Sequence, residues 1–375
     1  MALVKCSEYN IEEVKKAVDT LFELLGGVEQ FIKPGMKVLL KPNLIMKKKP
    51  EDMVITHPAV LEAVCSKVLS AGGIVTIADS PGGFYTSEIL NGIYSASGYK
   101  EVAKKLNVVL NMDTSSQEVE FEHGKVSKKL VLIKPALDAD FIINLPKLKT
   151  HMLMTYTGAV KNLFGLIPGA LKADYHIRMK QKEEFANLLV DICECVKPQL
   201  NIMDGIYGME GQGPTSGTPR KIGLLIGSSN PYSLDAAACH IIGLNRNQVP
   251  TLKSAFKRNL PSSIKEIDII GEKIEDCVIM DYNIPEARKD TRMIKNPIAI
   301  AILNRIRPKL EFDYNKCIVC KRCIDHCPAK ASYFKEGKPM IDSQKCIRCY
   351  CCHELCPGHA IEIRQNKILK KIIKH

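Results

Sequence analysis

The 375-residue sequence contains no tryptophan, and only 6% of its residues are aromatic. It lacks an apolar run near the ~18 residues that a membrane-spanning helix requires, since its longest candidate covers only 297–303. Its N-terminal segment lacks the apolar stretch of a secretory signal peptide. These absences argue against an integral membrane protein and against a secreted disulfide scaffold. We expect a globular, cytoplasmic protein without a membrane span, whose cysteines are reduced.

Fifteen cysteines are distributed unevenly, and nine of them fall between Cys317 and Cys356. Eight of the nine form two runs with the spacing Cys-x2-Cys-x2-Cys-x3-Cys-Pro: Cys317, Cys320, Cys323 and Cys327, then Cys346, Cys349, Cys352 and Cys356. Each cysteine of the first run has a counterpart in the second run at one constant offset, so the runs form an internal repeat. Zinc ribbons use pairs of Cys-x2-Cys, whereas this doubled run is typical of a bacterial two-cluster ferredoxin, which transfers single electrons at low potential.

The repeat predicts two [4Fe–4S] clusters, because three cysteines of each run surround one cluster and the fourth ligates the other. We expect cluster 1 on Cys317, Cys320, Cys323 and Cys356, and cluster 2 on Cys346, Cys349, Cys352 and Cys327. Cys351 lies outside the pattern, and we interpret it as a spare thiol near a cluster. The other six cysteines are interpreted as core thiols: Cys6, Cys65, Cys193, Cys195, Cys239 and Cys277.

The chain has a net charge of +12, and residues 311–375 supply half of this excess. Two clusters with eight thiolates would add about −4, which leaves this segment close to neutral. Nucleic-acid binding is disfavoured, because the sequence shows no basic stripe interleaved with aromatic residues. The basic segment 367–374 is interpreted as a solvated closing helix.

The N-terminal part of the chain, over 1–270, alternates apolar strands with amphipathic helices. Strands are expected at 38–40, 74–78, 140–143, 200–203 and 222–226, helices at 58–71, 183–196 and 232–242, and an edge hairpin at 118–133. A further helix is expected after Asn10, with Glu13 as its capping partner. This pattern predicts an α/β domain over 1–270, with a mostly parallel sheet and flanking helices. A linker or wrapping segment over 271–308 and a small α+β ferredoxin-like domain over 309–375 would follow it.

Ligands of open parallel sheets bind at the carboxyl ends of the strands. Polar residues follow four of the expected strands: Lys41 and Asn43, then Asp79, then Lys147, Lys149 and His151, then Asp204 and Glu210. We expect these strand ends to form a cleft. Its lysines, together with Lys161, favour a small anionic substrate such as a carboxylate or a phosphate.

Lys161 and Asn162 lie among apolar neighbours, where an unpartnered charge is costly. Lys161 is a candidate proton donor or oxyanion stabiliser, with a lysine that reaches solvent as the alternative. His151 and Lys149 are the other catalytic candidates. The substrate-binding candidates are Lys41, Asn43, His57, Asp79, Lys147, Asn162 and Glu210.

Three of these features have structural alternatives. His57 is either a catalytic acid or base or the cap of the helix that begins at Pro58. Gly82 and Gly83 either hold an anion or form a tight turn. The glycine-rich segment 205–217 is either a mobile lid or a surface loop, and it matches no nucleotide-binding fingerprint.

Six segments together resemble a known family: Lys41-Pro42-Asn43, Thr56-His57-Pro58, Asp79-Ser80-Pro81-Gly82-Gly83, 144–151, 158–165 and Asp204-Gly205. The chain resembles the iron–sulfur-associated "domain of unknown function 362" family over roughly residues 1–260 and the tail. This family is often fused to a two-cluster ferredoxin module in anaerobic bacteria and archaea. The resemblance implies an architecture and iron–sulfur chemistry, but it assigns no catalytic role to a residue.

Three functions remain open. The first is an oxidoreductase that passes electrons from an external donor protein, through two clusters, to an anionic substrate at the lysine-rich strand ends. The second is an electron carrier or an assembly factor for another metalloenzyme, which would form a stable complex without turnover. The third is a lyase or isomerase whose clusters are structural.

Overall fold

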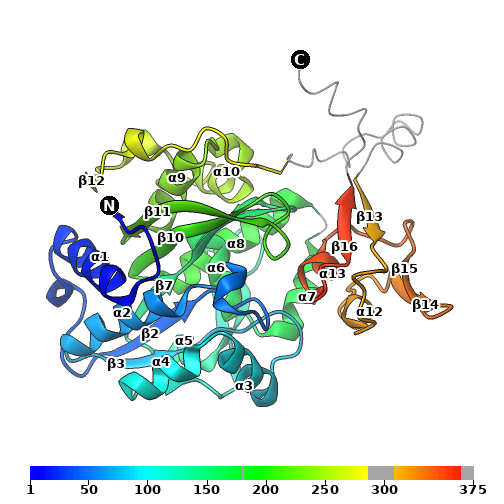
Figure 1. The fold of residues 1–375 in the computed structure, drawn as a ribbon, viewed down its shortest axis with the longest axis horizontal. Helices are drawn as coiled ribbons and strands as arrows, with labels where there is room; N and C mark the ends of the chain where they lie inside the picture. Colours follow the sequence, from blue (N-terminus) through cyan, green and yellow to red (C-terminus); the bar gives the residue numbers. More distant parts are fainter. Residues whose placement is uncertain (180, 286–307, 365–375) are drawn as a thin grey trace.

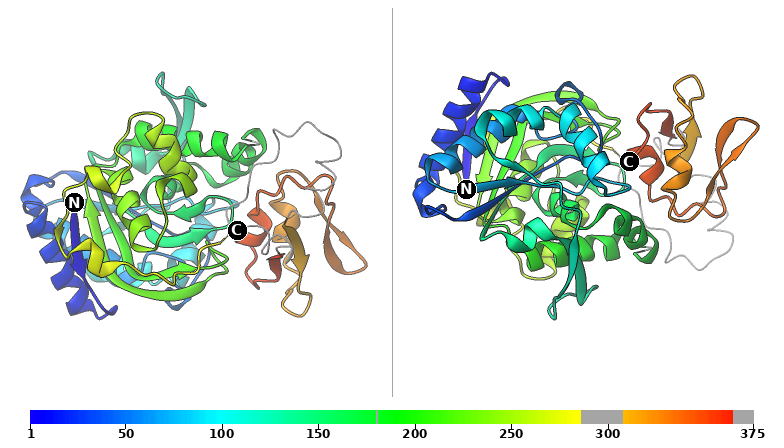
Figure 2. Two further views of the ribbon diagram at one scale, coloured as in Figure 1. Left: turned by 90° about the horizontal axis from the view of Figure 1, so that it is seen from above. Right: turned by 90° about the horizontal axis from the view of Figure 1, so that it is seen from below.

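A computed structural model describes residues 1–179, 181–285 and 308–364 (Figure 1). Residues 1–285 form a large α/β part, and residues 308–364 form a small part at one end of it (Figure 2). The expected helix at 367–374 and much of the expected linker lie outside the described residues. Among the described helices, none combines the length and apolar character needed to cross a bilayer.

A ten-stranded sheet runs through the large part. Its main path is β12 (Ile270–Gly271), β1 (Ala2–Lys5), β11 (Thr218–Ser228), β10 (Leu200–Glu210), β7 (Phe141–Leu145), β2 (Lys37–Pro42), β3 (Ile74–Ile77) and β4 (Val109–Leu110). The strands from β10 to β4 are parallel, while β11 is antiparallel to β10 and β1. Beside this path, β8 (Lys147–His151) pairs with β10, and β9 (Thr155–Thr157) pairs with β8. The predicted α/β class with a mostly parallel sheet is confirmed.

Helices cover both faces of the sheet, and alternate strand residues face each layer. In β2, Val38 and Leu40 share a core with α1 (Ile11–Leu24), α2 (Pro58–Ser70), α3 (Ser87–Ala96) and α4 (Tyr99–Leu106). Leu39 faces the opposite core, which contains α8 (Lys182–Val196). The remaining helices of this part are α5 (Lys134–Asp138), α6 (Ala159–Asn162), α7 (Gly169–Arg178), α9 (Pro231–Ile241) and α10 (Pro250–Phe256).

Local capping residues determine where the first two helices begin. The Asn10 side chain accepts hydrogen bonds from the backbone N–H groups of Glu12 and Glu13. The expected return bond from Glu13 does not form, because its carboxylate accepts the Ser7 N–H instead. At α2, His57 Nδ1 accepts the Ala59 N–H at 3.2 Å, which is the capping alternative predicted for this histidine.

Two expectations for loops and hairpins are corrected. Strands β5 (Ser116–Glu120) and β6 (Lys129–Ile133) form the predicted hairpin, but as a separate two-stranded sheet that projects from the body (Figure 2). Asp191 of α8 accepts three backbone N–H groups of its turn and so attaches it to a helix. Segment 205–217 combines the end of β10, over 205–210, with the connection to β11, over 211–217.

The small part consists of two copies of one structural unit. Strand β13 (Lys309–Phe312) pairs with β16 (Ile361–Arg364), and β14 (Ser332–Lys335) pairs with β15 (Lys338–Ile341). Short helices α12 (Arg322–Asp325) and α13 (Cys351–Glu354) occupy equivalent positions in the two cysteine runs. The internal repeat read from the cysteines is therefore also a repeat of the fold.

A buried polar network connects β8 to β10 and to the start of α2. Lys147 Nζ lies 2.9 Å from Asp204 Oδ2, and both side chains are fully buried. Asp204 also accepts the Tyr9 hydroxyl at 2.8 Å and the His57 N–H at 2.9 Å. Tyr9 stacks on His57 with ring centroids 3.7 Å apart. These contacts hold β10, β8 and α2 together.

We predict that Lys147→Met lowers the free energy of unfolding by about 3–5 kcal/mol, because it leaves a buried carboxylate without its cation. The double variant Lys147→Met/Asp204→Asn should lose less than the sum of the two single variants. Urea denaturation of the three proteins measures both quantities. A loss below about 1 kcal/mol for Lys147→Met would contradict the role of this pair in holding the fold.

Candidate functional site

The cysteine loops of the small part have an unusual backbone. Val319 and Lys321 in the first loop, and Arg348 and Tyr350 in the second, all have positive φ between 56° and 65°. Left-handed residues between the cysteines coil each loop tightly, and their recurrence at equivalent positions shows that both loops take the same shape. Backbone N–H groups also point at sulfur, from Ala331 to Cys327 (3.2 Å) and from Ala360 to Cys356 (3.3 Å).

The cysteine sulfurs divide into two sets of expected ligands. Cys317, Cys320, Cys323 and Cys356 line one small cavity. The pKa of Cys352 is raised well above its usual value by burial first, and then by Cys349, Cys346, Cys327 and Cys323. Cys352 therefore lies within electrostatic reach of the other three ligands expected for cluster 2. The first set consists of the four ligands expected for cluster 1, and we call the four ligands expected for cluster 2 the second set, whose grouping stays a prediction.

The donor sets fit iron–sulfur clusters in chemistry as well as in number. In the described residues, no three His, Cys, Asp or Glu side chains converge on a point as ligands of a single ion. Four thiolates around a cavity would repel one another unless a positively charged metal core lay between them. N–H groups directed at sulfur are a common feature around such clusters. The residues present are therefore suited to hold clusters.

Residues 211–217 of the β10–β11 connection dock the small part onto the large one. Thr215 Oγ1 donates to the Glu354 carbonyl at 3.0 Å, and Ser216 Oγ lies 2.8 Å from His359 Nδ1. The other ring nitrogen of His359 lies 2.8 Å from Lys48 Nζ. Lid motion of this segment would break these contacts, so its role in the structure is to position the cysteine loops.

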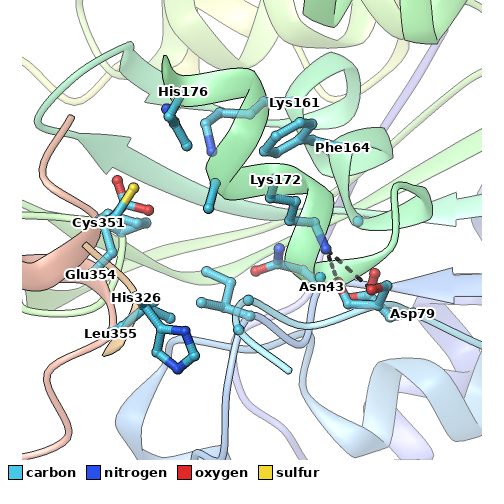
Figure 3. Close-up of a pocket in the computed structure, with 18 of the residues that line it drawn as sticks. Asn43, Asp79, Lys161, Phe164, Lys172, His176, His326, Cys351, Glu354 and Leu355 are labelled. Carbon is cyan, nitrogen blue, oxygen red and sulfur yellow. Dashed lines mark hydrogen bonds between the residues drawn. The ribbon is translucent and has the colours of Figure 1, made fainter. Parts of the chain in front are cut away.

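A cavity of about 270 Å³ lies between the two parts (Figure 3). The large part contributes Lys41, Asn43, Asp79, Lys161, Asn162, Lys172 and His176 to its wall, and the small part contributes His326, Cys327, Cys351, Glu354 and Leu355. Strand ends β2 and β3 and helices α6 and α7 therefore face the cysteine loops across one space. Cys327 belongs to the second sulfur set, so this space adjoins an expected cluster site.

The floor of the cavity is a network of buried polar side chains. Lys41 Nζ lies 2.8 Å from Asp79 Oδ1 and 3.2 Å from Asn162 Oδ1, which also accepts Asn43 Nδ2 at 2.9 Å. Asn43 Oδ1 in turn accepts Lys149 Nζ at 2.5 Å. Each ammonium therefore has partners within the protein, as a buried charge requires. Four predicted residues (Lys41, Asn43, Asp79 and Asn162) come together here.

Lys161 differs from the other lysines because, within the described part of the chain, it makes neither an ion pair nor a hydrogen bond. Its exposed surface faces the cavity (Figure 3). Burial lowers the pKa of its ammonium, while Glu354 and Cys351 act in the opposite direction. The predicted catalytic candidate is thus a lysine of the cavity wall that has no ion-pair partner among the described residues.

His151 lies behind the cavity wall. Its Nδ1 accepts the N–H groups of Leu153 and Met154, and its Nε2 lies 3.3 Å from Glu354 Oε1. Burial lowers the pKa of His151 well below its usual value, so the ring is neutral and its proton resides on Nε2. Burial raises the pKa of Glu354, and Lys161 and Lys149 oppose this. Glu354, which lines the cavity, therefore lies between His151 and that space.

Four other predicted residues do not line the cavity. Lys147 is bound to Asp204, and His57 caps α2. Lys149 supports the floor through Asn43 and the Val54 carbonyl. Glu210 lies at the far end of β10, where its carboxylate accepts the Asn283 N–H at 2.9 Å. Because β8 continues the sheet after β7, its side chains are directed into the protein instead of into a loop cleft.

Lys172 and His176 were missed by the sequence analysis. They lie one helical turn apart on α7, so they share one face of that helix, and this face lines the cavity. Lys172 Nζ donates to the Ser80 and Pro81 carbonyls. Burial lowers the pKa of His176 to about 3, so its ring is neutral. The sequence signal that could have identified these two residues is their Lys-x3-His spacing on a short helix after Gly169.

Three glycines allow this close assembly. A Cβ on Gly165 would lie 2.1 Å from Asp79 Oδ1 and 2.5 Å from Lys41 Nζ. Cβ atoms on Gly82 and Gly83 would meet Leu355 at 2.9 Å and His326 at 3.1 Å. The Gly82 N–H donates to the Ile45 carbonyl, so it does not serve an anion. Gly82 and Gly83 therefore form a turn that lets the small part approach.

We predict that the Lys172 amine titrates near pH 7, because burial lowers its pKa to about 7. Asp79 raises this pKa, and Lys41 and Lys161 lower it further. Below pH 7 the ammonium should resist acetic anhydride, and above pH 7 the free amine should react. Mass spectrometry of labelled peptides across pH 5–10 gives the midpoint, with exposed Lys104 as the reference lysine. Labelling of Lys172 that follows the ordinary lysine midpoint of about 10.4 would contradict this assignment.

Comparison with known proteins identifies both parts. The family described as domain of unknown function (DUF362) matches residues 38–240, and the 4Fe-4S dicluster domain matches residues 309–357. The small part is therefore an iron–sulfur domain. A thylakoid-associated protein of Synechocystis sp. is 35% identical over 293 residues, which cover 76% of this chain and 88% of that relative.

Two solved structures show more distant similarity. The lactate racemase apoprotein from Thermoanaerobacterium thermosaccharolyticum has a TM-score of 0.38 at 16% identity, over 61% of this chain and 54% of that one. A protein from Thermotoga maritima has a TM-score of 0.33 at 12% identity, over 59% of this chain and 56% of that one. The chain thus spans little more than half of each structure. The family and domain matches confirm the resemblance inferred from the sequence, and the chain belongs to the domain of unknown function 362 family.

Proposed function

We propose that this protein is an iron–sulfur oxidoreductase in which two [4Fe–4S] clusters pass low-potential electrons to a small anionic substrate held in the cavity between the two parts. The observation that supports this most directly is the composition of the cavity wall. Cys327, an expected cluster ligand, lines the same space as Lys161 and Lys172. An electron-transfer centre and a cationic binding site would therefore be neighbours.

The size and charge of the cavity limit the substrate class. At about 270 Å³ the cavity lies just below the usual range of about 300–1,000 Å³ for ligand pockets. It suits a small metabolite better than a dinucleotide. Among the residues that the structure describes, Lys161 has no ion-pair partner, and an anionic group would provide one. Ile45, Phe84 and Leu355 add an apolar side to the wall.

Iron–sulfur clusters supply one-electron transfer, so a two-electron reduction of the bound molecule needs two electrons from an external donor and two protons. Lys161 would hold the anionic group and stabilise the negative charge that develops as electrons arrive. Its lowered pKa also makes the ammonium a better proton donor. Lys41 and Asp79 would keep the Lys161 helix in place through Asn162, which bonds Lys41 and belongs to α6.

We predict about eight irons and eight sulfides per chain after anaerobic purification. Cys317→Ser and Cys346→Ser should each reduce the iron content to about four, because each removes one ligand set. Cys351→Ser and the half-buried Cys195→Ser should retain the full content. Iron analysis and EPR of the reduced proteins measure this. An unchanged iron content in Cys346→Ser together with a loss in Cys351→Ser would contradict the assignment of the second set.

We also predict that Lys161→Met slows cluster reoxidation by an anionic acceptor about ten-fold or more, since a charged contact to the reacting molecule is lost. The dithionite-reduced protein is mixed with pyruvate, fumarate and other carboxylate or phosphate acceptors, and the visible absorbance is followed. Iron content and reduction by dithionite should not change. Lys104→Met, an exposed lysine on α4, is the matched control.

Two results would contradict the proposed function. In the first, none of the acceptors reoxidises the wild-type clusters faster than buffer alone. In the second, Lys161→Met reacts as fast as Lys104→Met with an acceptor that the wild type uses. The first result would favour a carrier or assembly factor that hands electrons to a protein.

A further inference from the structure

Large apolar side chains are exposed around the first sulfur set. Ile318 is 66% exposed, Val319 49% and Phe334 38%, and all three line the small cavity of Cys317, Cys320, Cys323 and Cys356. Cys320 is itself exposed. Tyr314, 43% exposed, lies beside them and donates to the carbonyl of Pro339, which lines the same cavity. We call Tyr314, Ile318, Val319 and Phe334 the outer patch.

Two lysines frame the outer patch. Lys321 Nζ lies 5.5 Å from the centre of the Phe334 ring, and Lys338 Nζ lies 5.1 Å from the centre of the Tyr314 ring. Among the described residues neither lysine has a carboxylate partner, whereas the nearby Lys316 and Lys335 pair with Asp313 and Glu336. The rim of the patch is therefore positively charged and free to meet an acidic surface.

The two sulfur sets differ in their surroundings. The second set includes buried Cys352 and the cavity residue Cys327, and α13 faces the large part (Figure 1). The β14–β15 hairpin, which carries Phe334 and Lys338, lies on the side away from the large part (Figure 1). Another protein would therefore transfer electrons to a cluster at the first sulfur set, which lies at the surface, while the substrate cavity adjoins the second sulfur set.

From this arrangement we infer that the outer patch is the docking surface for an acidic electron-transfer protein, which donates electrons at the first sulfur set. An apolar centre framed by unpaired cations suits a partner with a small apolar spot inside an acidic rim. Each encounter oxidises the donor by one electron and reduces this chain by one electron, and no bond or proton is exchanged. The inference rests on the cluster arrangement of the proposed function.

The test uses the full-length, cluster-loaded protein and an acidic plant-type [2Fe–2S] ferredoxin as the probe. Binding of the oxidised ferredoxin is measured by calorimetry at low and high salt, and electron transfer from the reduced ferredoxin is measured by stopped flow. We expect Lys321→Glu/Lys338→Glu to weaken binding about ten-fold or more at low salt, because like charges then face each other. The rate should fall in parallel, and the salt dependence should flatten or reverse.

The control variant Lys104→Glu/Lys128→Glu makes the same change in net charge on exposed lysines of α4 and the β5–β6 hairpin. It should bind and react like the wild type. Ile318→Ser should weaken binding without altering the salt dependence, because it removes only apolar contact. Reduction by dithionite should be the same in all variants, which separates loss of docking from loss of clusters and from failure of the proposed function at the cavity.

Equal weakening in the control and patch variants would overturn the inference, because it would show an effect of net charge alone. Equal affinity of the wild type and the patch variant would also overturn it. So would sedimentation that shows a dimer of this chain lost only in the patch variants, since the patch would then meet a second copy.

Discussion

The cost of burying an ammonium group without a partner determines how this molecule is built around its cavity. Lys41 is paired with Asp79, Lys147 with Asp204, and Lys149 is bound by Asn43 and a backbone carbonyl. Each pairing joins two sheet strands or a strand and a loop, so satisfying the charges also positions the strand ends. Lys161 stands on the same framework without such a partner. Among the described residues Lys161 has neither an ion pair nor a hydrogen bond and lines the cavity, so a ligand there can supply the partner that the other buried lysines find within the protein.

Docking of the iron–sulfur domain turns an open strand edge into a partly enclosed cavity. The turn at Gly82 and Gly83 approaches Leu355 and His326, and residues 211–217 hold His359 and the Glu354 backbone. The same contacts bring Cys327 to the cavity wall. Binding chemistry and the expected electron-transfer centre therefore depend on one interface, and neither part forms the cavity alone.

Features with local causes could be predicted from the sequence, and those that depend on distant packing could not. The cysteine spacing predicts two ligand sets because tight loops around a cluster impose it, and the structure gathers the residues of the first set around one small cavity. The polar ends of β2 and β3 reach the cavity because parallel strands share an edge. Lys147, Lys149 and His151 were expected there too, but β8 continues the sheet and turns them inward. Lys172 and His176 were overlooked because α7 follows no strand directly, so only the tertiary fold brings its face to the cavity.

In the small part, equivalent residues of the two halves of the repeat have different surroundings. Asp325 and Glu354 occupy equivalent positions and both line the cavity, but Glu354 also lies 3.3 Å from His151 Nε2 of the large part. Ile318 and Ile347 are also equivalent, but Ile318 is 66% exposed and Ile347 only 36%. The large part meets both halves of the repeat, at His326 and at Leu355, but Cys320 and Cys323 of the first loop are more exposed than their counterparts Cys349 and Cys352. The two expected clusters therefore have different neighbours: apolar side chains at the surface surround the first, and the cavity adjoins the second. Transfer of electrons from a protein surface to a buried site requires such a difference.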